Sequence, residues 1–173
     1  TKPKAVYRTI KQLTRERDQV VQERTMAKNQ LHAEQAEAEP HASSVKRIKA
    51  RIAFLNKQEK EIQQEIAKVA KEDRQVSHSI KLIQSIPGVG LLTAVVVLAE
   101  TNGFELIRNK RQLTNYAGLD VIEKQSGTSV RSKPRISKKG NRSLRKAMHL
   151  PALSAIGHSK RYKGLFAILV AKH

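Results

Sequence analysis

The sequence predicts an all-α protein, in which a long antiparallel helical hairpin precedes a small helical domain. The first 80 residues contain no glycine and only two prolines, Pro3 and Pro40, so little in them interrupts a helix. Apolar residues recur along this stretch at alternating spacings of three and four. All eight glycines lie at or after Gly88, where they divide the remaining chain into shorter helices.

The predicted hairpin covers residues 1–80 and carries one heptad seam in each half. The first seam has two arginine interruptions and consists of Ile10, Leu13, Arg17, Val20, Arg24, Ala27 and Leu31. The second seam is polar at two positions and consists of Val45, Ile48, Ile52, Leu55, Glu59, Ile62, Ile66, Val69, Asp73, Val76 and Ile80. Seams of this kind predict two helices that pack as a coiled coil.

The segment between the two seams, residues 39–44, predicts a tight connection. Pro40 disfavours helix at Glu39, and Ser43 or Ser44 can cap the helix that follows. A connection this short makes the two helices antiparallel neighbours. Because a long hairpin without a globular core tends to recruit another copy, we expect a homodimer or a higher assembly through this arm. The alternative is a monomeric hairpin folded onto the second domain.

The second region, residues 81–173, is predicted to form short helices separated by glycine turns. The expected elements are a helix over 77–85, an apolar helix over 91–100, a helix from Asn109 to Tyr116 ended by Gly118, a polar loop over 119–139 with a short hairpin as an alternative, a helix from Asn141 to Ile156 that crosses Pro151 and is ended by Gly157, and a last helix over 162–171.

The chain is strongly basic, with 34 Lys and Arg against 15 Asp and Glu and a formal net charge of +19. The excess is concentrated after residue 80, where 17 basic residues face 4 acidic ones. Such a balance predicts a polyanionic partner, which is nucleic acid or an acidic membrane surface.

Several classes of protein are excluded by composition. The absence of Cys excludes a disulfide scaffold, a Cys-based zinc site and thiol catalysis. No apolar run approaches the roughly 20 residues that cross a bilayer, and the first residues do not form a signal peptide. We therefore expect a cytoplasmic protein with no membrane partner. Six aromatic residues are too few to make base stacking on aromatic platforms the main mode of binding.

The first candidate motif lies between two predicted helices, at residues 85–94. Gly88 and Gly90 permit positive φ and expose backbone N–H groups at the start of a helix, where they can hold a DNA phosphate without reading bases. Lys81 and Thr93 are candidate side-chain helpers. This is the pattern of a helix-hairpin-helix motif. The alternative is a helical corner that only packs.

The second candidate motif, residues 118–142, combines hydroxyl side chains with many lysines and arginines. A serine that attacks a phosphodiester needs positive charge on the phosphoryl oxygens, which Arg131 and Arg135 can supply. It also needs a proton acceptor, and the nearest carboxylates are Asp120 and Glu123. From the residues alone, a basic loop that grips DNA without chemistry is the favoured interpretation.

The third candidate motif, residues 141–150, predicts a basic amphipathic helix. The residues expected to face inward are Leu144, Ala147, Met148 and Leu150, and those expected on the opposite face are Arg142, Arg145, Lys146 and His149. Contact with the DNA backbone is favoured over a membrane surface, because large apolar anchors are scarce. His149 and His158 are too sparse for a metal site.

Taken in order, five segments resemble the transposases of the insertion sequence 110 group, also called the 116/110/902 type. They are Ser-Ile-Pro-Gly-Val-Gly at 85–90, Thr-Ala at 93–94, Arg-Gln-Leu-Thr-Asn-Tyr-Ala-Gly-Leu at 111–119, Gln-Ser-Gly-Thr-Ser-Val-Arg at 125–131, and Ile-Ser-Lys-Lys-Gly-Asn-Arg-Ser-Leu-Arg-Lys-Ala at 136–147. The resemblance covers roughly residues 77–173, and the long helices before it look like the coiled-coil segment of the same proteins.

The resemblance implies a mechanism of DNA transposition and recombination. In this family an N-terminal resolvase-like domain binds Mg²⁺ through four acidic residues, and a C-terminal serine forms a covalent link to DNA under the guidance of a structured RNA. The family serine corresponds to Ser126, with Ser129 as the main competitor, and Arg131 becomes a residue that faces phosphate. Nothing in residues 1–80 replaces the acidic residues, so Mg²⁺ is expected upstream of this chain and no cofactor within it.

These expectations define a mobile-element transposase fragment, with a dimerisation arm over 1–80 and a DNA-binding domain over 81–173. Its expected partners are double-stranded DNA, a guide RNA and a second copy, near the bacterial nucleoid. The predicted catalytic residue is Ser126, and the predicted DNA-binding residues are Gly88, Gly90, Thr93, Arg131, Lys133, Arg135, Lys138, Lys139, Arg142 and Arg145. The alternatives are a non-catalytic helix-hairpin-helix module that binds nucleic acid and a structural coiled-coil oligomeriser.

Overall fold

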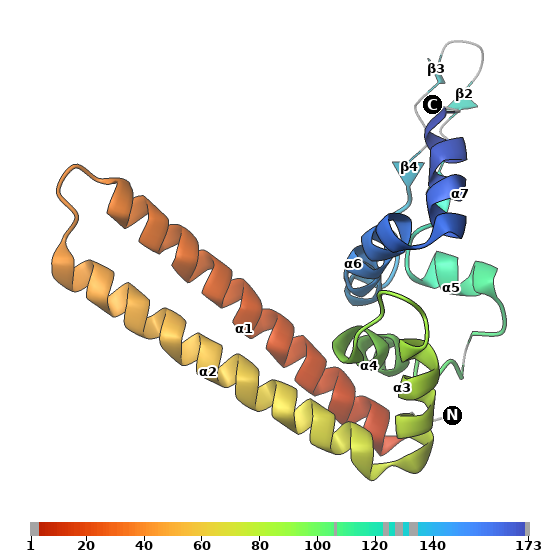
Figure 1. Ribbon diagram of the computed structural model, residues 1–173, viewed down its shortest axis with the longest axis horizontal. Helices are drawn as coiled ribbons and strands as arrows, with labels where there is room; N and C mark the ends of the chain where they lie inside the picture. Colours follow the sequence, from red (N-terminus) through yellow and green to blue (C-terminus); the bar gives the residue numbers. More distant parts are fainter. Residues whose placement is uncertain (1–3, 106, 123–124, 127–129, 132–134, 172–173) are drawn as a thin grey trace.

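A computed structural model describes residues 4–105, 107–122, 125–126, 130–131 and 135–171, and only the backbone of residues 125, 126, 130 and 131. This part of the chain is largely helical, which confirms the all-α prediction. The helices are α1 (Ala5–Ala36), α2 (Ala42–Glu72), α3 (Arg74–Gln84), α4 (Leu91–Glu100), α5 (Lys110–Tyr116), α6 (Arg142–His158) and α7 (Lys160–Ala171). The strands are β1 (Val121–Ile122), β2 (Gln125–Ser126), β3 (Val130–Arg131) and β4 (Arg135–Ile136). Figure 1 shows a V, in which the arm formed by α1 and α2 diverges from the C-terminal helices.

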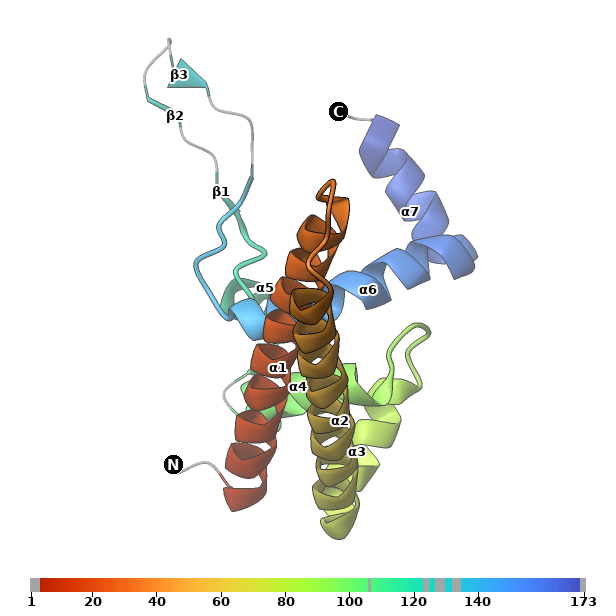
Figure 2. The same ribbon diagram turned by 90° about the vertical axis from the view of Figure 1, so that its left-hand side faces the viewer.

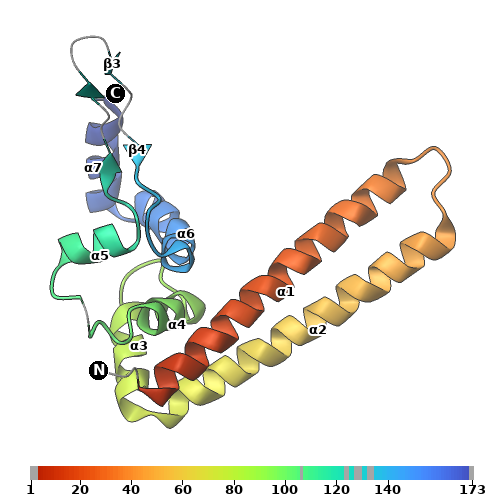
Figure 3. The ribbon, with the colours of Figure 1, turned by 180° about the vertical axis from the view of Figure 1, so that it is seen from behind.

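The arm is an antiparallel pair of helices that run side by side over most of their length (Figures 1 and 3). The heptad seams predicted from sequence lie between them as far as Val69, whereas Val76 and Ile80, predicted to continue the second seam, belong to the separate helix α3 (Arg74–Gln84). Ile10, near the start of α1, is 1% exposed, and Ile66, near the end of α2, is 0% exposed. Since each seam buries its apolar residues against the other, the arm needs no further partner to cover them. Assembly through the arm stays a prediction.

The polar interruptions of the two seams meet each other. Arg17 Nη2 donates to Glu59 Oε1 at 2.5 Å, and Arg24 donates to the other oxygen of the same carboxylate. Glu59 is 8% exposed, so this pairing lies within the apolar seam. A shift of one helix along the other would leave buried charges without partners. We therefore interpret the Arg–Glu–Arg layer as the feature that sets the register of the arm.

The turn of the arm is capped differently from the prediction. The N-cap of α2 is His41, whose Nδ1 accepts the Ser44 backbone N–H at 3.4 Å, so the expectation that Ser43 or Ser44 caps this helix is wrong. The seam ends where Asp73 accepts the N–H groups of Gln75 and Val76 at 2.8 and 3.0 Å. This cap starts α3 as a separate helix and explains a polar residue at that heptad position.

Helix α4 occupies the centre of the molecule, at the base of the V. Ala94 and Val95 are fully buried, and α4 packs against α1, α3 and α6. One core continues from the arm through α3 into α4, and α3 spans the boundary predicted after residue 80. Among the described residues, no helix is both long and apolar enough to cross a bilayer.

The C-terminal helices differ from the prediction in two respects. Helix α6 continues through Gly157 to His158, so Gly157 does not end it, although Pro151 lies within the helix as predicted. Leu150 and Met148 are 72% and 37% exposed, so the expectation that both face inward is wrong. Leu144 is buried as expected. Burial along α6 is therefore confined to Leu144 and Pro151.

The Arg–Glu–Arg layer yields a prediction for stability. Glu59→Gln removes the shared carboxylate and leaves the guanidinium groups of Arg17 and Arg24 facing each other inside the seam. We expect a loss of about 1–3 kcal/mol in the free energy of unfolding, measured by urea denaturation with circular dichroism. The control is Glu61→Gln, an exposed residue on the same helix, expected to change stability by less than about 0.5 kcal/mol. Equal effects of the two substitutions would contradict the proposed role of the layer.

Candidate nucleic-acid interface

The serine-rich segment forms a narrow β-hairpin, the alternative that the sequence left open for residues 119–139. In β1 and β4, Val121 pairs with Ile136 and Ile122 with Arg135. Farther out, β2 and β3 pair Gln125 with Arg131 and Ser126 with Val130. Figure 2 shows the hairpin projecting away from the helices, with β2 and β3 at its far end. Ser126 thus lies in the strand pair most distant from the body.

The root of the hairpin is closed by backbone contacts between its two ends. Asn141 N–H donates to the Tyr116 carbonyl at 2.7 Å, and Lys138 N–H donates to the Gly118 carbonyl at 3.0 Å. Gly118 has a φ of +66°, and a Cβ added at Gly140 would lie 2.6 Å from the Gly118 nitrogen. The two strands approach so closely here that neither glycine can carry a side chain without displacing backbone. Gly118 ends α5 in the left-handed conformation, as predicted.

Helix α6 is joined to the same root. The side chain of Asn141 caps this helix by accepting the Leu144 N–H at 2.9 Å. Arg145 Nη1 donates to the Ala117 carbonyl at 2.6 Å, so this predicted DNA-binding residue is half-buried and has a structural partner. The returning strand and the next helix are therefore held against the end of α5.

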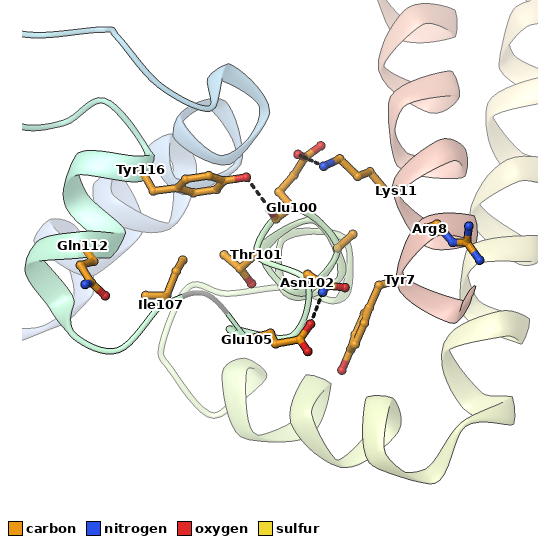
Figure 4. Close-up of a pocket in the computed structure, with 11 residues that line it drawn as sticks. Tyr7, Arg8, Lys11, Glu100, Thr101, Asn102, Glu105, Ile107, Gln112 and Tyr116 are labelled. Carbon is orange, nitrogen blue, oxygen red and sulfur yellow. Dashed lines mark hydrogen bonds and ion pairs between the residues drawn. The ribbon is translucent and has the colours of Figure 1, made fainter. Parts of the chain in front are cut away.

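A buried carboxylate, Glu100 at the end of α4, connects this root to the arm. Its side chain is 0% exposed and lies 3.2 Å from Lys11 Nζ and 3.0 Å from Arg15 Nε, both on α1. It also accepts from Asn141 Nδ2 at 2.7 Å. Figure 4 shows the Tyr116 hydroxyl pointing to the backbone carbonyl of Glu100, to which it donates at 2.8 Å. One residue thus bonds to α1 and to both ends of the hairpin.

Electrostatics keep this carboxylate ionised. Burial raises the pKa of the Glu100 carboxyl, but hydrogen bonds from Arg15 and Asn141 and the charge of Lys11 outweigh burial and hold the pKa below its ordinary value. A buried charge of this kind is stable only with such partners. Glu100 was not among the residues predicted from the sequence, although a lone acid at the end of an apolar helix in so basic a chain is a signal that could have found it.

The predicted DNA-binding cations near the hairpin lie on an exposed surface. Arg135 in β4, Lys138 and Lys139 in the turn, and Arg142 at the start of α6 are exposed, and none of them pairs with a carboxylate of the described residues. Exposed cations that form no ion pair suit phosphate contacts. Lys133, Ser129 and the side chains of Ser126 and Arg131 lie outside the described residues.

The Pro-Gly turn between α3 and α4 has features of both predicted alternatives, a helix-hairpin-helix turn that binds phosphate and a helical corner that only packs. Gly88 has a φ of +86°, as predicted, and a Cβ on it would lie 2.8 Å from the Ser154 side chain, so this turn packs against α6. Gly90 is extended, with a φ of −84°, so the expected positive φ is wrong there. The N-terminus of α4 has no side-chain cap, which leaves its N–H groups suited to an anion.

Thr93 lies in the first turn of α4. It lines a cleft of about 290 Å³ between α1, α4 and α6, together with Ser143 and Lys146. Lys146 pairs with Asp18 of α1 across this cleft. The structure therefore places Thr93 among packed helices. Its predicted role in DNA binding stays a prediction.

The chain matches the IS116/IS110/IS902 transposase family over residues 80–166, from the end of α3 into α7. The match includes the hairpin and Ser126. Among curated proteins, it is similar to the pilin gene-inverting protein of Moraxella bovis, with 30% identity over 79 residues. That alignment covers 46% of this chain and 24% of the relative.

Another relative is the insertion element IS110 uncharacterized 43.6 kDa protein of Streptomyces coelicolor, with 36% identity over 75 residues, 43% of this chain and 18% of the relative. The pilin gene-inverting protein of Moraxella lacunata is 30% identical over 82 residues, which cover 46% of this chain and 24% of that protein. The matched part thus corresponds to about a quarter or less of each relative's length. The family match covers half of the residues of this chain, including the hairpin and the helices that hold it. The chain therefore belongs to the IS116/IS110/IS902 transposase family.

Proposed function

We propose that the hairpin of this chain brings the hydroxyl of Ser126 to a phosphodiester of double-stranded DNA, while the cations at its base hold neighbouring phosphates. The observation that carries the proposal is the closed hairpin root. It places Ser126 at the far end of a hairpin whose base is joined to α4, α5 and α6 and is lined by exposed cations. A nucleophile needs a defined position, and a fixed base limits where the hairpin can carry Ser126.

The proposed reaction is transfer of a phosphoryl group from DNA to serine. The Oγ of Ser126 forms a bond to phosphorus as the bond between phosphorus and one bridging sugar oxygen breaks. The departing sugar oxygen gains a proton, and the serine hydroxyl loses one, so atoms and charge balance. Cations beside the phosphate stabilise the charge that develops on its non-bridging oxygens. In this proposal the link is reversed when a second DNA end attacks the phosphoserine.

The remaining partners are proposed for the full-length protein. A guide RNA, a second copy of the protein and Mg²⁺ follow from the resemblance to the family. Among the described residues no group of three or more His, Asp or Glu side chains is arranged to hold a metal ion. In this proposal Mg²⁺ is held by the N-terminal domain that the resemblance to the family implies, and this chain supplies cations and the hydroxyl.

A second candidate function is a non-catalytic module that binds the DNA backbone. The uncapped N-terminus of α4 and the left-handed Gly88 favour it, because together they leave backbone N–H groups suited to a phosphate. In that case the hairpin would contribute charge only. The two functions differ in whether a covalent bond to DNA forms.

The nucleophile is tested with Ser126→Ala in the full-length protein. With end-labelled DNA, the wild type is expected to form a denaturant-resistant adduct with protein, and Ser126→Ala to lose it, because no other oxygen occupies that position. DNA affinity should change by less than about threefold, since the substitution removes no charge. Ser129→Ala is the matched control and should keep the adduct. An adduct that persists in Ser126→Ala and disappears in Ser129→Ala would move the assignment to Ser129, and one that never forms would favour the non-catalytic module.

The cationic surface is tested by the salt dependence of DNA binding. Replacing Arg135, Lys138, Lys139 and Arg142 with Gln removes up to four phosphate contacts. Each contact contributes about 0.9 to the slope of log affinity against log salt, so the slope should fall by about 3 to 4 in fluorescence anisotropy titrations. Four Gln substitutions on the arm, at the exposed Lys46, Lys49, Lys60 and Lys68, provide the control and should leave the slope nearly unchanged. An unchanged slope in the hairpin variant would place the DNA elsewhere.

A further inference from the structure

The C-terminal helices carry a broad exposed apolar surface. Leu165, Phe166 and Leu169 of α7 are 52%, 47% and 51% exposed, and Leu153 of α6 is 53% exposed. Helix α7 packs against α6 and stands away from the rest of the molecule (Figure 1). Helices with apolar residues on several faces are normally covered, and large exposed apolar patches mark interaction sites.

Part of this surface is hollowed into a groove of about 300 Å³. The groove lies between the turn that follows α3 and the helices α6 and α7, and its lining includes Ile86, Pro87, Met148, Pro151, Ala152 and Phe166. Neither α6 nor α7 contains an acidic residue, whereas Lys160, Arg161 and Lys163 are close by in sequence at the start of α7. The occupant that fits is therefore a segment whose small apolar side chains can enter the groove and whose acidic side chains can face these cations.

Such a segment exists in this chain, at the far end of the arm. Between residues 29 and 45 there is no Lys or Arg, although the chain as a whole has a net charge of +19. This arm tip, residues 33–40, contains Glu34, Glu37 and Glu39 alternating with alanines and followed by Pro40. The three glutamates are not buried and make no ion pair with the described residues.

The arm tip and the groove of the same molecule cannot meet. Helix α1 has 32 residues and is therefore about 48 Å long. Figures 1 and 3 show the arm tip and α7 at the two separated ends of the V. A second copy removes this obstacle, and a two-fold axis between the copies would place each arm tip in the groove of the other.

We infer that the arm tip of a second copy docks in this groove. Its alanines and Pro40 cover the apolar lining, and its three glutamates face Lys160, Arg161 and Lys163. Pairing of α7 with α7 of another copy would instead bring these cations against each other, which disfavours that arrangement. The inference does not depend on the chemistry of Ser126, because it concerns a different face of the chain.

Cross-linking tests the contact directly, since the chain has no Cys of its own. Ala38→Cys in one population and Ala152→Cys in another place one thiol on the arm tip and one in the groove. On mixing and oxidation we expect a disulfide-linked dimer that contains one chain of each kind. Ala53→Cys, on the exposed middle of the arm, replaces Ala38→Cys as the control and should give little mixed dimer. A mixed yield no greater than in this control, or linkage only between two Ala152→Cys chains, would overturn the inference.

Charge exchange tests its electrostatic basis. Reversing Glu34, Glu37 and Glu39 to Lys should weaken self-association in sedimentation equilibrium by about tenfold or more at low salt. Reversing Lys160, Arg161 and Lys163 to Glu in the same chain should restore it. Reversal of the exposed Glu23, Glu65 and Glu72, elsewhere on the arm, should leave association unchanged. Failure of the second reversal to restore association, with helicity intact by circular dichroism, would contradict the pairing.

Discussion

A single buried carboxylate connects the parts of this molecule. Glu100 receives Lys11 and Arg15 from the arm and Asn141 from the start of α6, while its backbone carbonyl accepts from Tyr116 at the end of α5. A carboxylate with no solvent exposure is tolerated only because these donors replace water. Glu100 therefore joins the arm to the base of the serine hairpin, beside the apolar core that also packs the arm against α4, and the proposed chemistry at the hairpin depends on this junction.

Much of the fold follows from the sequence, because local patterns decide it. Alternating spacings of three and four place Ile10 and Ile66 in facing seams, Asn109 and Gly118 bound α5, and the lack of glycine before residue 88 makes the arm continuous. The errors also have local causes. His41 displaced two serines as the cap of α2 because its ring nitrogen accepts the Ser44 N–H, so the helix begins at Ala42, ahead of both serines. Gly157 did not end α6 because glycine is only a weak breaker within a helix.

The site was less predictable, because its geometry depends on contacts between distant residues. The resemblance to the family predicted Ser126, and the basic motif predicted the cations of the hairpin. Spacing along the chain does not reveal that Glu100 meets Lys11, or that Arg145 bonds to Ala117 rather than being left free. The heptad interruptions illustrate the same limit. Arg17 and Glu59 each look like a defect in one heptad seam. Only their pairing between α1 and α2 indicates that they set the register of the arm.

The central claim is that Glu100 fixes the root of the serine hairpin. Amide hydrogen exchange in the wild type and in Glu100→Gln tests it most directly. If Glu100 holds the root, the amides of Lys138 and Asn141, which bond across the root, should exchange at least about tenfold faster in the variant, while those of the α2 midsection stay unchanged. Equal exchange at the root in both proteins would show that the backbone contacts hold the hairpin without Glu100, and the account would be wrong.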